Sequence, residues 1–280
     1  MNQQGILYVV ATPIGNLGDI TLRALDILKM VDVVAAEDTR HTSGLLNGFK
    51  MAKKLIAVHQ HNEQQSAEKL IALLQAGQNI ALVTDAGTPA ISDPGAIVVK
   101  AVRAAGVTVV PIPGASAVIA ALSASGITDN GFYFIGFLPA SGAARRKVLE
   151  SVKTVPATLV LYEAPHRILE SVADIANVLG ERQITFCREL TKTFETIVTC
   201  STLQASAWLQ ADTNQQRGEF VLLIEVAHIE VEAISEDAIR VLKLLMAELP
   251  LKHATKLAAD ITGAKKNDLY ELALTLKNDK

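Results

Sequence analysis

The sequence predicts an α/β fold of two domains, the first with a parallel sheet, followed by a helical C-terminal segment. Two patterns predict this fold class. Short, uninterrupted apolar runs alternate with segments of helical periodicity, which is typical of parallel strands buried on both faces. The alternation restarts at residue 132, and after Ser235 only helical patterns remain. A chain of 280 residues is also long enough for two domains of ~100–200 residues each.

The first domain is expected to span residues 1–126. Its apolar runs predict strands at residues 6–11, 33–36, 55–59, 79–84 and 107–112. Helices are predicted around residues 22–28, 63–76 and 95–105. Glycines end the last two of these helices, at Gly77 and Gly106. Because helices separate the strands, the strands are expected to run parallel.

The second domain is expected to span residues 127–228 and to be of mixed α/β type. Strands are predicted at residues 132–137, 157–163, 183–190, 194–199 and 218–226. Helices are predicted at residues 144–153, at residues 166–179 and around Trp208. Only a few residues separate the third strand from the fourth, which leaves no room for a helix, so this pair is expected to be antiparallel.

The tail, residues 229–280, is predicted to contain three helices. Ser235 is placed to cap the first, Pro250 separates it from the second, Thr262-Gly263 ends the second, and Asn267 is placed to cap the third. A Gly-containing turn between two helices is typical of a helix-turn-helix, but a plain helical bundle packed on the second domain fits the pattern equally well.

Composition excludes several classes of protein. Half of the residues are hydrophobic, which excludes disorder, and no apolar run reaches the ~18 residues of a membrane span. The first residues lack the basic region of a signal peptide, and two cysteines are too few for a disulfide scaffold or a four-ligand zinc site. A cytoplasmic protein is therefore expected. With a net charge of −3, any nucleic-acid binding requires a local basic patch.

Five loops follow the predicted strands of the first domain, and parallel sheets bind ligands at that edge. Their sequences are ATPIGNLGD, EDTRHT, HQHNE, TDAGTPAISDPG and PIPGASA. Four of them are rich in Gly, Pro, Ser, Thr and carboxylates, which lets backbone groups approach a ligand closely. Neither GxGxxG nor GxxxxGK[ST] occurs, so neither a standard dinucleotide site nor a Walker P-loop is supported.

Six segments together resemble the ribosomal RNA small subunit methyltransferase I family, one of the tetrapyrrole-methylase-like enzymes that use S-adenosylmethionine (SAM). They are ATPIGNLGDIT (11–21), AEDTR (36–40), DAGTPAISDPG (85–95), PIPGASA (111–117), EAPHR (163–167) and RELTK (188–192). The resemblance implies the two-domain tetrapyrrole-methylase-like fold (class III methyltransferase) with a helix-turn-helix-like tail. It also implies a homodimer that methylates the ribose 2′-hydroxyl of a cytidine in the decoding region of 16S rRNA.

The same resemblance implies the residues of a SAM site between the two domains. Relatives carry a Gly-Asp-Pro turn where this sequence has Gly87-Thr88-Pro89, so a hydroxyl replaces the carboxylate. The expected cofactor residues are Pro13, Asp85, Ala86, Gly87, Thr88, Pro89, Gly114, Ala115, Ser116, Ala117, Tyr162, Ala164, Glu219 and Phe220. Ser116 could be a helix N-cap at the same time.

A ribose hydroxyl is a poor nucleophile, so a base or proton acceptor near it would help the transfer. The expected catalytic residues are Glu37, Arg40, Glu163 and His166. The cluster around Glu37 could instead be ion pairs that hold its loop, and His166 could be structural. No metal site is expected, because His59 and His61 lack further ligands at a credible spacing.

Basic residues of the second domain are the candidates for contacts with RNA phosphates. They are Arg145, Arg146, Lys147, Arg167, Arg188 and Lys192. The basic helix could also be a solvated face. Two other functions stay open: a methylase of small tetrapyrroles, which would need neither the basic segment nor the tail, and a non-catalytic α/β protein that binds RNA or a nucleotide.

Overall fold

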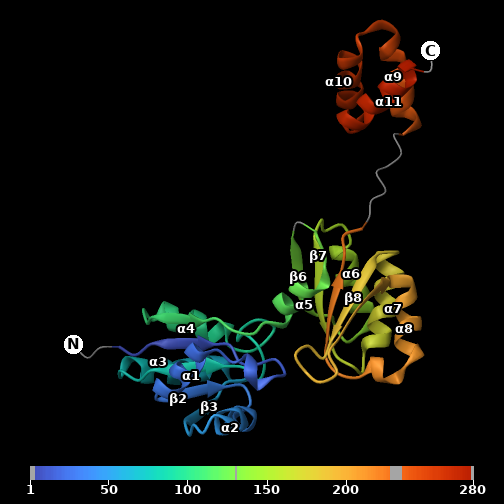
Figure 1. Cartoon of the computed structure of the whole chain (residues 1–280). Coiled ribbons are helices and arrows are strands. Elements are labelled where there is room, and N and C mark those ends of the chain that lie inside the picture. The colour runs from blue at the N-terminus through green and yellow to red at the C-terminus, as the bar shows by residue number, and fades with distance from the viewer. Residues whose placement is uncertain (1–3, 130, 228–234, 279–280) are drawn as a thin grey trace. The chain divides into compact units, whose positions relative to one another are not determined.

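A computed structural model describes residues 4–129, 131–227 and 235–278. The chain divides into two compact units, with the division after Ala227. The first unit contains both sheets and the second contains the helices of the tail (Figure 1). Within the described ranges, no helix is long and apolar enough to cross a bilayer.

The first sheet is parallel throughout, as the sequence predicts. Its strand order is β3-β2-β4-β1-β5. The strands are β1 (Leu7–Val10), β2 (Val33–Ala36), β3 (Lys54–Ala57), β4 (Ile80–Val83) and β5 (Val109–Ile112). The central strands β2 and β4 are buried at every position, because hydrophobic clusters cover both faces of the sheet. This explains why they are uninterrupted apolar runs.

The helices α1 to α4 belong to the part of the chain that carries the first sheet (Figure 1). They are α1 (Leu22–Met30), α2 (Thr39–Gly48), α3 (Glu63–Gln75) and α4 (Ala96–Ala104), and a 3-10 turn, η1 (Leu17–Asp19), precedes α1. The sequence analysis missed α2. Asp38 caps this helix by accepting a hydrogen bond from the backbone N–H of Arg40, and Thr42 and Leu46 are buried.

The second sheet is mixed, with the order β6-β7-β10-β8-β9. The strands are β6 (Phe132–Phe137), β7 (Thr158–Glu163), β8 (Gln183–Arg188), β9 (Thr196–Ser201) and β10 (Phe220–Ile224). The pair β8 and β9 is antiparallel, which confirms the prediction from their short connection. Strand β6 is parallel to β7 and carries a bulge between Phe134 and Gly136.

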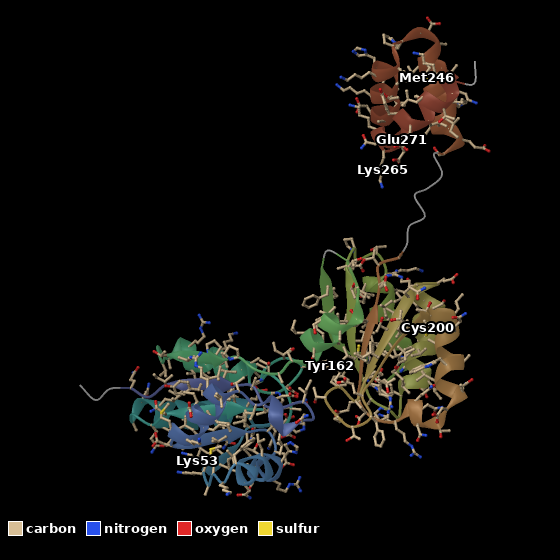
Figure 2. The ribbon with its side chains drawn as sticks, in the orientation of Figure 1. Lys53, Tyr162, Cys200, Met246, Lys265 and Glu271 are labelled. Carbon is tan, nitrogen blue, oxygen red and sulfur yellow. The ribbon has the colours of Figure 1, made fainter. Side chains whose placement is uncertain are left out.

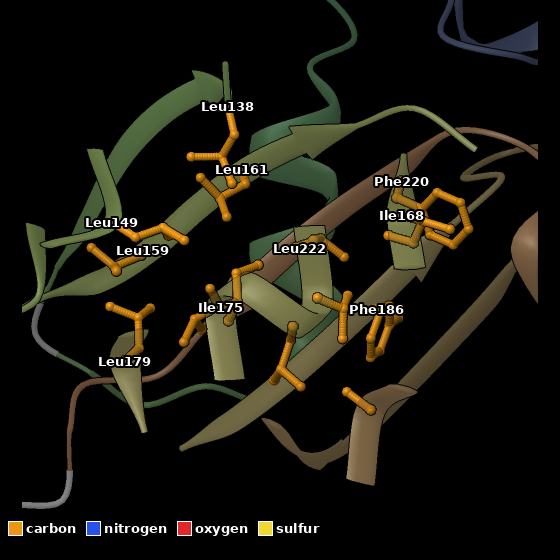
Figure 3. Packing of buried hydrophobic residues seen from close by; sticks show 14 of the residues in the cluster. Leu138, Leu149, Leu159, Leu161, Ile168, Ile175, Leu179, Phe186, Phe220 and Leu222 are labelled. Atoms are coloured by element: carbon orange, nitrogen blue, oxygen red, sulfur yellow. The ribbon is translucent and has the colours of Figure 1, made fainter. Parts of the chain in front are cut away.

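Helices cover both faces of the second sheet. The larger core includes Phe186 and Leu222 and is shown in Figure 3. Its helices are α6 (Gly142–Val152), α7 (Ile168–Leu179) and α8 (Thr202–Ala211), and η2 (Thr213–Gln216) follows α8. On the smaller core lies α5 (Ala117–Ser125), a helix that the sequence analysis also missed. Its residues fall within the expected first domain, yet the helix packs against the second sheet. The expected boundary at residue 126 stays a prediction.

The C-terminal unit is a three-helix bundle with its own small core. Its helices are α9 (Glu236–Glu248), α10 (Leu251–Thr262) and α11 (Lys266–Asn278). Ser235 caps α9, and Gly263 ends α10 in the left-handed conformation at φ 73°, as predicted. The prediction that Asn267 caps the third helix is wrong, because α11 already begins at Lys266.

Candidate active site

Three loops at the carboxyl edge of the first sheet are joined by hydrogen bonds. Thr12, after β1, exchanges two backbone hydrogen bonds with Gly87, after β4, at 2.9 and 3.1 Å. The hydroxyl of Thr88 donates to the carbonyl oxygen of Ala115, after β5, at 3.2 Å. These bonds hold the three motif loops as one structure at the edge where parallel sheets bind ligands.

A cavity of about 320 Å³ lies between these loops and the second sheet within the first unit. Nine of the fourteen expected cofactor residues line it: Ala86, Gly87, Thr88, Ser116, Ala117, Tyr162, Ala164, Glu219 and Phe220. The lining also includes residues that the sequence analysis did not select, namely Ile14, Ile91, Ser92, Asp93, Phe137, Pro165, Cys187, Leu190 and Val221.

The other five expected cofactor residues, Pro13, Asp85, Pro89, Gly114 and Ala115, lie outside the lining. Asp85 accepts a hydrogen bond from the backbone N–H of Asp38 at 3.1 Å, which joins the loops after β2 and β4. A Cβ atom on Gly114 would lie 2.9 Å from the Cβ atom of Ala11. Gly114 is therefore required by packing within the loops, rather than by room for a ligand.

Asp93 is the acidic side chain of the long β4 loop that faces the cavity. Burial, together with the nearby carboxylates of Glu37 and Asp85, raises the pKa of Asp93 to about 6. The hydroxyl of Thr84 lowers this pKa in part, but that hydroxyl donates to Glu37 at 2.7 Å. Asp93 lies in the DAGTPAISDPG motif, but the sequence does not distinguish it from Asp85 of the same motif, and the nearby Glu37 comes from another segment of the chain.

The backbone around Asp93 is unusual. Ala90 and Ser92 have positive φ angles, 69° and 62°, which non-glycine residues adopt only when the surroundings enforce them. A Cβ atom on Gly136, at the bulge of β6, would lie 2.8 Å from the Ser92 hydroxyl. Because Gly136 has no side chain, Ser92 and the loop that carries Asp93 can pack closely against the second sheet at the bulge.

Aromatic and small residues form another part of the lining. Tyr162, on β7 (Figure 2), lies with its ring 5.5 Å from that of Phe137. Burial and the carboxylate of Asp93 raise the pKa of Tyr162. Ser116 occupies the N-cap position of α5 but makes no side-chain capping bond, so its hydroxyl and the first N–H groups of the helix are available beside the cavity.

Glu163 ends β7 and is only 2% exposed. It accepts hydrogen bonds from Ala164 N–H at 2.7 Å, from Arg167 Nε at 2.8 Å and from the Ser171 hydroxyl. These three hydrogen bonds hold the EAPHR segment in place. They favour a structural role for Glu163 over a role as general base. His166 is exposed and lies outside the lining.

Lys192 reaches the cavity from the turn after β8. Its Nζ donates to Glu189 at 2.8 Å and to Glu219 at 2.9 Å. Burial lowers the pKa of Lys192, but the hydrogen bonds to these carboxylates outweigh it, so the net shift is upward. Glu189 and Thr191 have positive φ angles of 52° and 66°, so the turn that presents Lys192 is strained.

The remaining expected residues are used differently from the prediction. Arg145 is only 3% exposed and pairs with Asp174 and Glu170, so the expectation that it contacts RNA from an open helix face is wrong. Arg146 and Lys147, the next residues of α6, are exposed. Arg188 donates to the carbonyl groups of Arg217 and Phe194, which fixes two loops, whereas the side chain of Arg40 is 90% exposed beside Asp38.

Comparisons with known proteins match almost the whole chain. The family model for tetrapyrrole (corrin/porphyrin) methylases matches residues 6–205, and that for the RsmI C-terminal HTH domain matches residues 232–277. A ribosomal RNA small subunit methyltransferase I from Escherichia coli O157:H7 is 54% identical over 98% of this chain and 96% of its own length. The Pseudomonas aeruginosa protein of the same name is 52% identical over 96% and 97%.

The chain belongs to the ribosomal RNA small subunit methyltransferase I family. It is a methyltransferase, and SAM is the methyl donor. The family model for the tail also decides between the two alternatives there, in favour of the helix-turn-helix class.

Solved structures show the same fold at low sequence identity. A diphthine synthase matches with a TM-score of 0.62 and 15% identity, over 79% of this chain and 90% of its own. A cobalt precorrin-4 methyltransferase matches with a TM-score of 0.58 and 19% identity, over 78% and 94%. Both confirm the two-domain tetrapyrrole-methylase-like fold for this member of the ribosomal RNA small subunit methyltransferase I family.

The residues around the cavity fit SAM. The volume of about 320 Å³ lies within the range of small-molecule sites, ~300–1,000 Å³. The rings of Phe137 and Tyr162 suit the positive charge of a sulfonium. The uncapped start of α5 at Ser116 suits a carboxylate, because helix N-terminal N–H groups attract anions. The lining therefore fits both the sulfonium and the carboxylate of this methyl donor.

Proposed function

We propose that this chain 2′-O-methylates the ribose of a cytidine in the decoding region of 16S rRNA, with SAM as the methyl donor. One observation carries the proposal: five of the six motifs that resemble the family line the cavity, and the likeness to the relatives extends over almost the full chain. The curated relatives are named as methyltransferases of the small-subunit ribosomal RNA. The family resemblance supplies the nucleoside and the 2′-hydroxyl.

When bound, SAM supplies a methyl group that its sulfonium makes strongly electrophilic. The contribution of the chain is therefore to align the acceptor oxygen and to exclude water. Gly87 and Thr88 form one wall of the cavity, Ser116 and Ala117 another, and Tyr162 with Phe137 provides an apolar surface. Glu163 keeps the EAPHR turn in place through Arg167 and Ser171, and Lys192 adds a positive charge at the rim.

The RNA is proposed to be held by exposed basic groups around this site and by the tail. Arg146 and Lys147 lie on the exposed side of α6, and Arg40 and His166 are exposed near the motif loops. In the C-terminal unit, Lys252 and Lys256 of α10, Lys265 of the following turn and Lys266 of α11 are all exposed. Each phosphate contact of this kind adds affinity that falls with salt. A homodimer, the assembled small subunit as acceptor and a cytoplasmic location complete the proposal, on the family resemblance.

The test uses methyl-labelled SAM and small ribosomal subunits that lack the modification. Nuclease digestion and mass spectrometry of the 16S rRNA should identify one 2′-O-methylcytidine in the decoding region. Naked 16S rRNA and a porphyrinoid acceptor are assayed in parallel. Labelling of the porphyrinoid alone would establish a tetrapyrrole methylase, and RNA binding without transfer to any acceptor would establish a non-catalytic protein. Label on a base or on another nucleotide would refute the 2′-O-cytidine assignment.

A further inference from the structure

Asp93 differs from the other acidic side chains near the cavity in its hydrogen bonding. It lines the cavity, is half-buried and follows the strained residues Ala90 and Ser92. The neighbouring carboxylates have fixed tasks: Glu37 accepts from the Thr84 hydroxyl at 2.7 Å and Asp85 from the Asp38 N–H at 3.1 Å. Among the carboxylates of the lining that the structure describes, Glu163 is paired with Arg167 and Glu219 with Lys192, whereas Asp93 has no ion pair with a basic side chain.

The basic groups around the cavity do not neutralise Asp93. Lys192 is the lysine of the lining, and its Nζ already bonds to Glu189 and Glu219. Arg167 is paired with Glu163 at 2.7 Å. The groups that act on Asp93 are the carboxylates of Glu37 and Asp85, which raise its pKa, and the Thr84 hydroxyl, which lowers it in part. Asp93 in turn raises the pKa of Tyr162, on the second sheet. Asp93 is therefore protonated more readily than an aspartate on the protein surface.

We propose that Asp93 is the catalytic residue that accepts the proton of the acceptor hydroxyl during methyl transfer. This inference rests on the proposed 2′-O-methylation. As the O–H bond breaks, the acceptor oxygen forms its bond to the methyl carbon and the proton passes to an Asp93 carboxylate oxygen. The electron pair of the broken S–C bond stays on sulfur. Water then removes the proton from Asp93 after the product leaves.

The acidity of Asp93 suits this task. A carboxyl group with a pKa of about 6 is mainly ionised near neutral pH, yet it is a stronger base than an ordinary aspartate at 3.8. General bases are most effective when their pKa lies close to the working pH, and they contribute ~10²–10⁴-fold to the rate. The acidic neighbours Glu37 and Asp85 therefore have a function in tuning Asp93.

The decisive variant is Asp93→Asn, which keeps the shape and removes the basic oxygen. Single-turnover transfer to the small subunit is measured from pH 5 to 9, and SAM affinity is measured by isothermal titration. We expect a ~10²–10⁴-fold lower rate with a SAM Kd within about threefold of wild type. Asp26→Asn, on the exposed side of α1, is the matched control and should change neither quantity.

Two further measurements separate Asp93 from its neighbour Glu37. Carbon-13 NMR of labelled aspartate carboxyls should give wild type one resonance that titrates near pH 6 and is missing in Asp93→Asn. Glu37→Gln removes a negative charge beside Asp93, so it should move both this titration and the acidic limb of the rate profile to lower pH.

The proposal is overturned by any of three results. These are a loss of SAM affinity of tenfold or more in Asp93→Asn, a rate within fivefold of wild type in that variant, or a larger rate loss in Glu37→Gln than in Asp93→Asn. Assay of the wild-type protein distinguishes failure of the Asp93 proposal from failure of the proposed function. If wild type forms no 2′-O-methylcytidine, the proposed function is refuted and the role of Asp93 falls with it.

Discussion

Replacing Arg145 by alanine should destabilise the first unit, and the size of the effect follows from its contacts. The guanidinium bonds to Asp174 at 2.6 Å, to the Ala140 carbonyl oxygen at 3.3 Å and to Glu170 at 3.4 Å, with 4% of the side chain exposed. Removing one partner of a buried pair costs about 3–5 kcal/mol, because the other charge remains buried. Asp174 keeps a bond to Arg146 at 3.0 Å, so we expect the lower end, about 3 kcal/mol.

A loss of this size is measurable in two ways. It corresponds to a fall in Tm of about 6–12 °C, at about 2–4 °C per kcal/mol for a unit of this size. Trp208 is the one tryptophan of the chain, and its ring lies 4.8 Å from that of Phe186 in the second core. Its fluorescence during urea unfolding therefore reports the free energy of unfolding of this unit.

Lys147→Ala is the matched control from the same helix, because Lys147 is exposed. It should change the free energy of unfolding by less than about 0.5 kcal/mol. If Lys147 contacts a phosphate, the variant should bind RNA more weakly, with a salt slope shallower by about one unit. A loss below 1 kcal/mol in Arg145→Ala, or equal losses in both variants, would contradict a buried structural ion pair.

The pH dependence gives a second check on Arg145. Burial opposes ionisation of Asp174, but hydrogen bonds from Arg145 and Arg146 outweigh it, so the pKa of Asp174 lies below its usual 3.8. A depressed pKa contributes stability that is present above the unfolded-state pKa and is lost as the pH falls through the folded-state pKa. The free-energy difference between wild type and Arg145→Ala should therefore shrink below about pH 4. A difference that is constant into acid would contradict the ion pair.

Three further predictions concern the cavity and the tail. Gly87 has φ 81°, so valine at this position should strain the loop. Gly87→Val should raise the SAM Kd at least tenfold while circular dichroism shows an intact fold. Unchanged SAM affinity would refute the assignment of this loop to the cofactor. Burial raises the pKa of Cys187 to about 12, so mass spectrometry should find it unalkylated by iodoacetamide at pH 8, and rapid labelling would contradict that environment. Truncation after Ala227 should leave SAM affinity unchanged and weaken RNA binding at least tenfold, and equal RNA affinity would exclude the tail from binding.

The sequence predicts the strands better than the helices, for a physical reason. Strands such as β2 and β4 are buried at every position, so burial leaves a continuous apolar run. Helix α2 leaves no such pattern, because its ten residues include Gly44 and Gly48 and few apolar side chains. It forms because Asp38 caps it and because Leu46 packs into the core, and packing overrides the low propensity of glycine.

The motif loops of the site are predictable from the sequence, but the task of each side chain is not. Arg145 and Lys147 look alike in a basic run, and only the position of Asp174, 29 residues away on α7, makes the first of them structural. In the same way, Asp93 is one carboxylate among many until the fold brings Glu37, from the loop after β2, close to it. Both assignments depend on contacts between distant segments, which local patterns do not encode.

The contrast between Asp93 and the other buried acids connects the fold to the chemistry. Asp174 and Glu163 each have arginine partners, and Glu63 accepts a hydrogen bond from the backbone at the start of α4. Such pairing is the rule for buried charge. Asp93 instead lies among like charges, in a loop with strained backbone, so its arrangement opposes stability. A protein keeps a local conflict of this kind where it serves function, and in this chain the conflict lies in the wall of the cavity that fits the methyl donor.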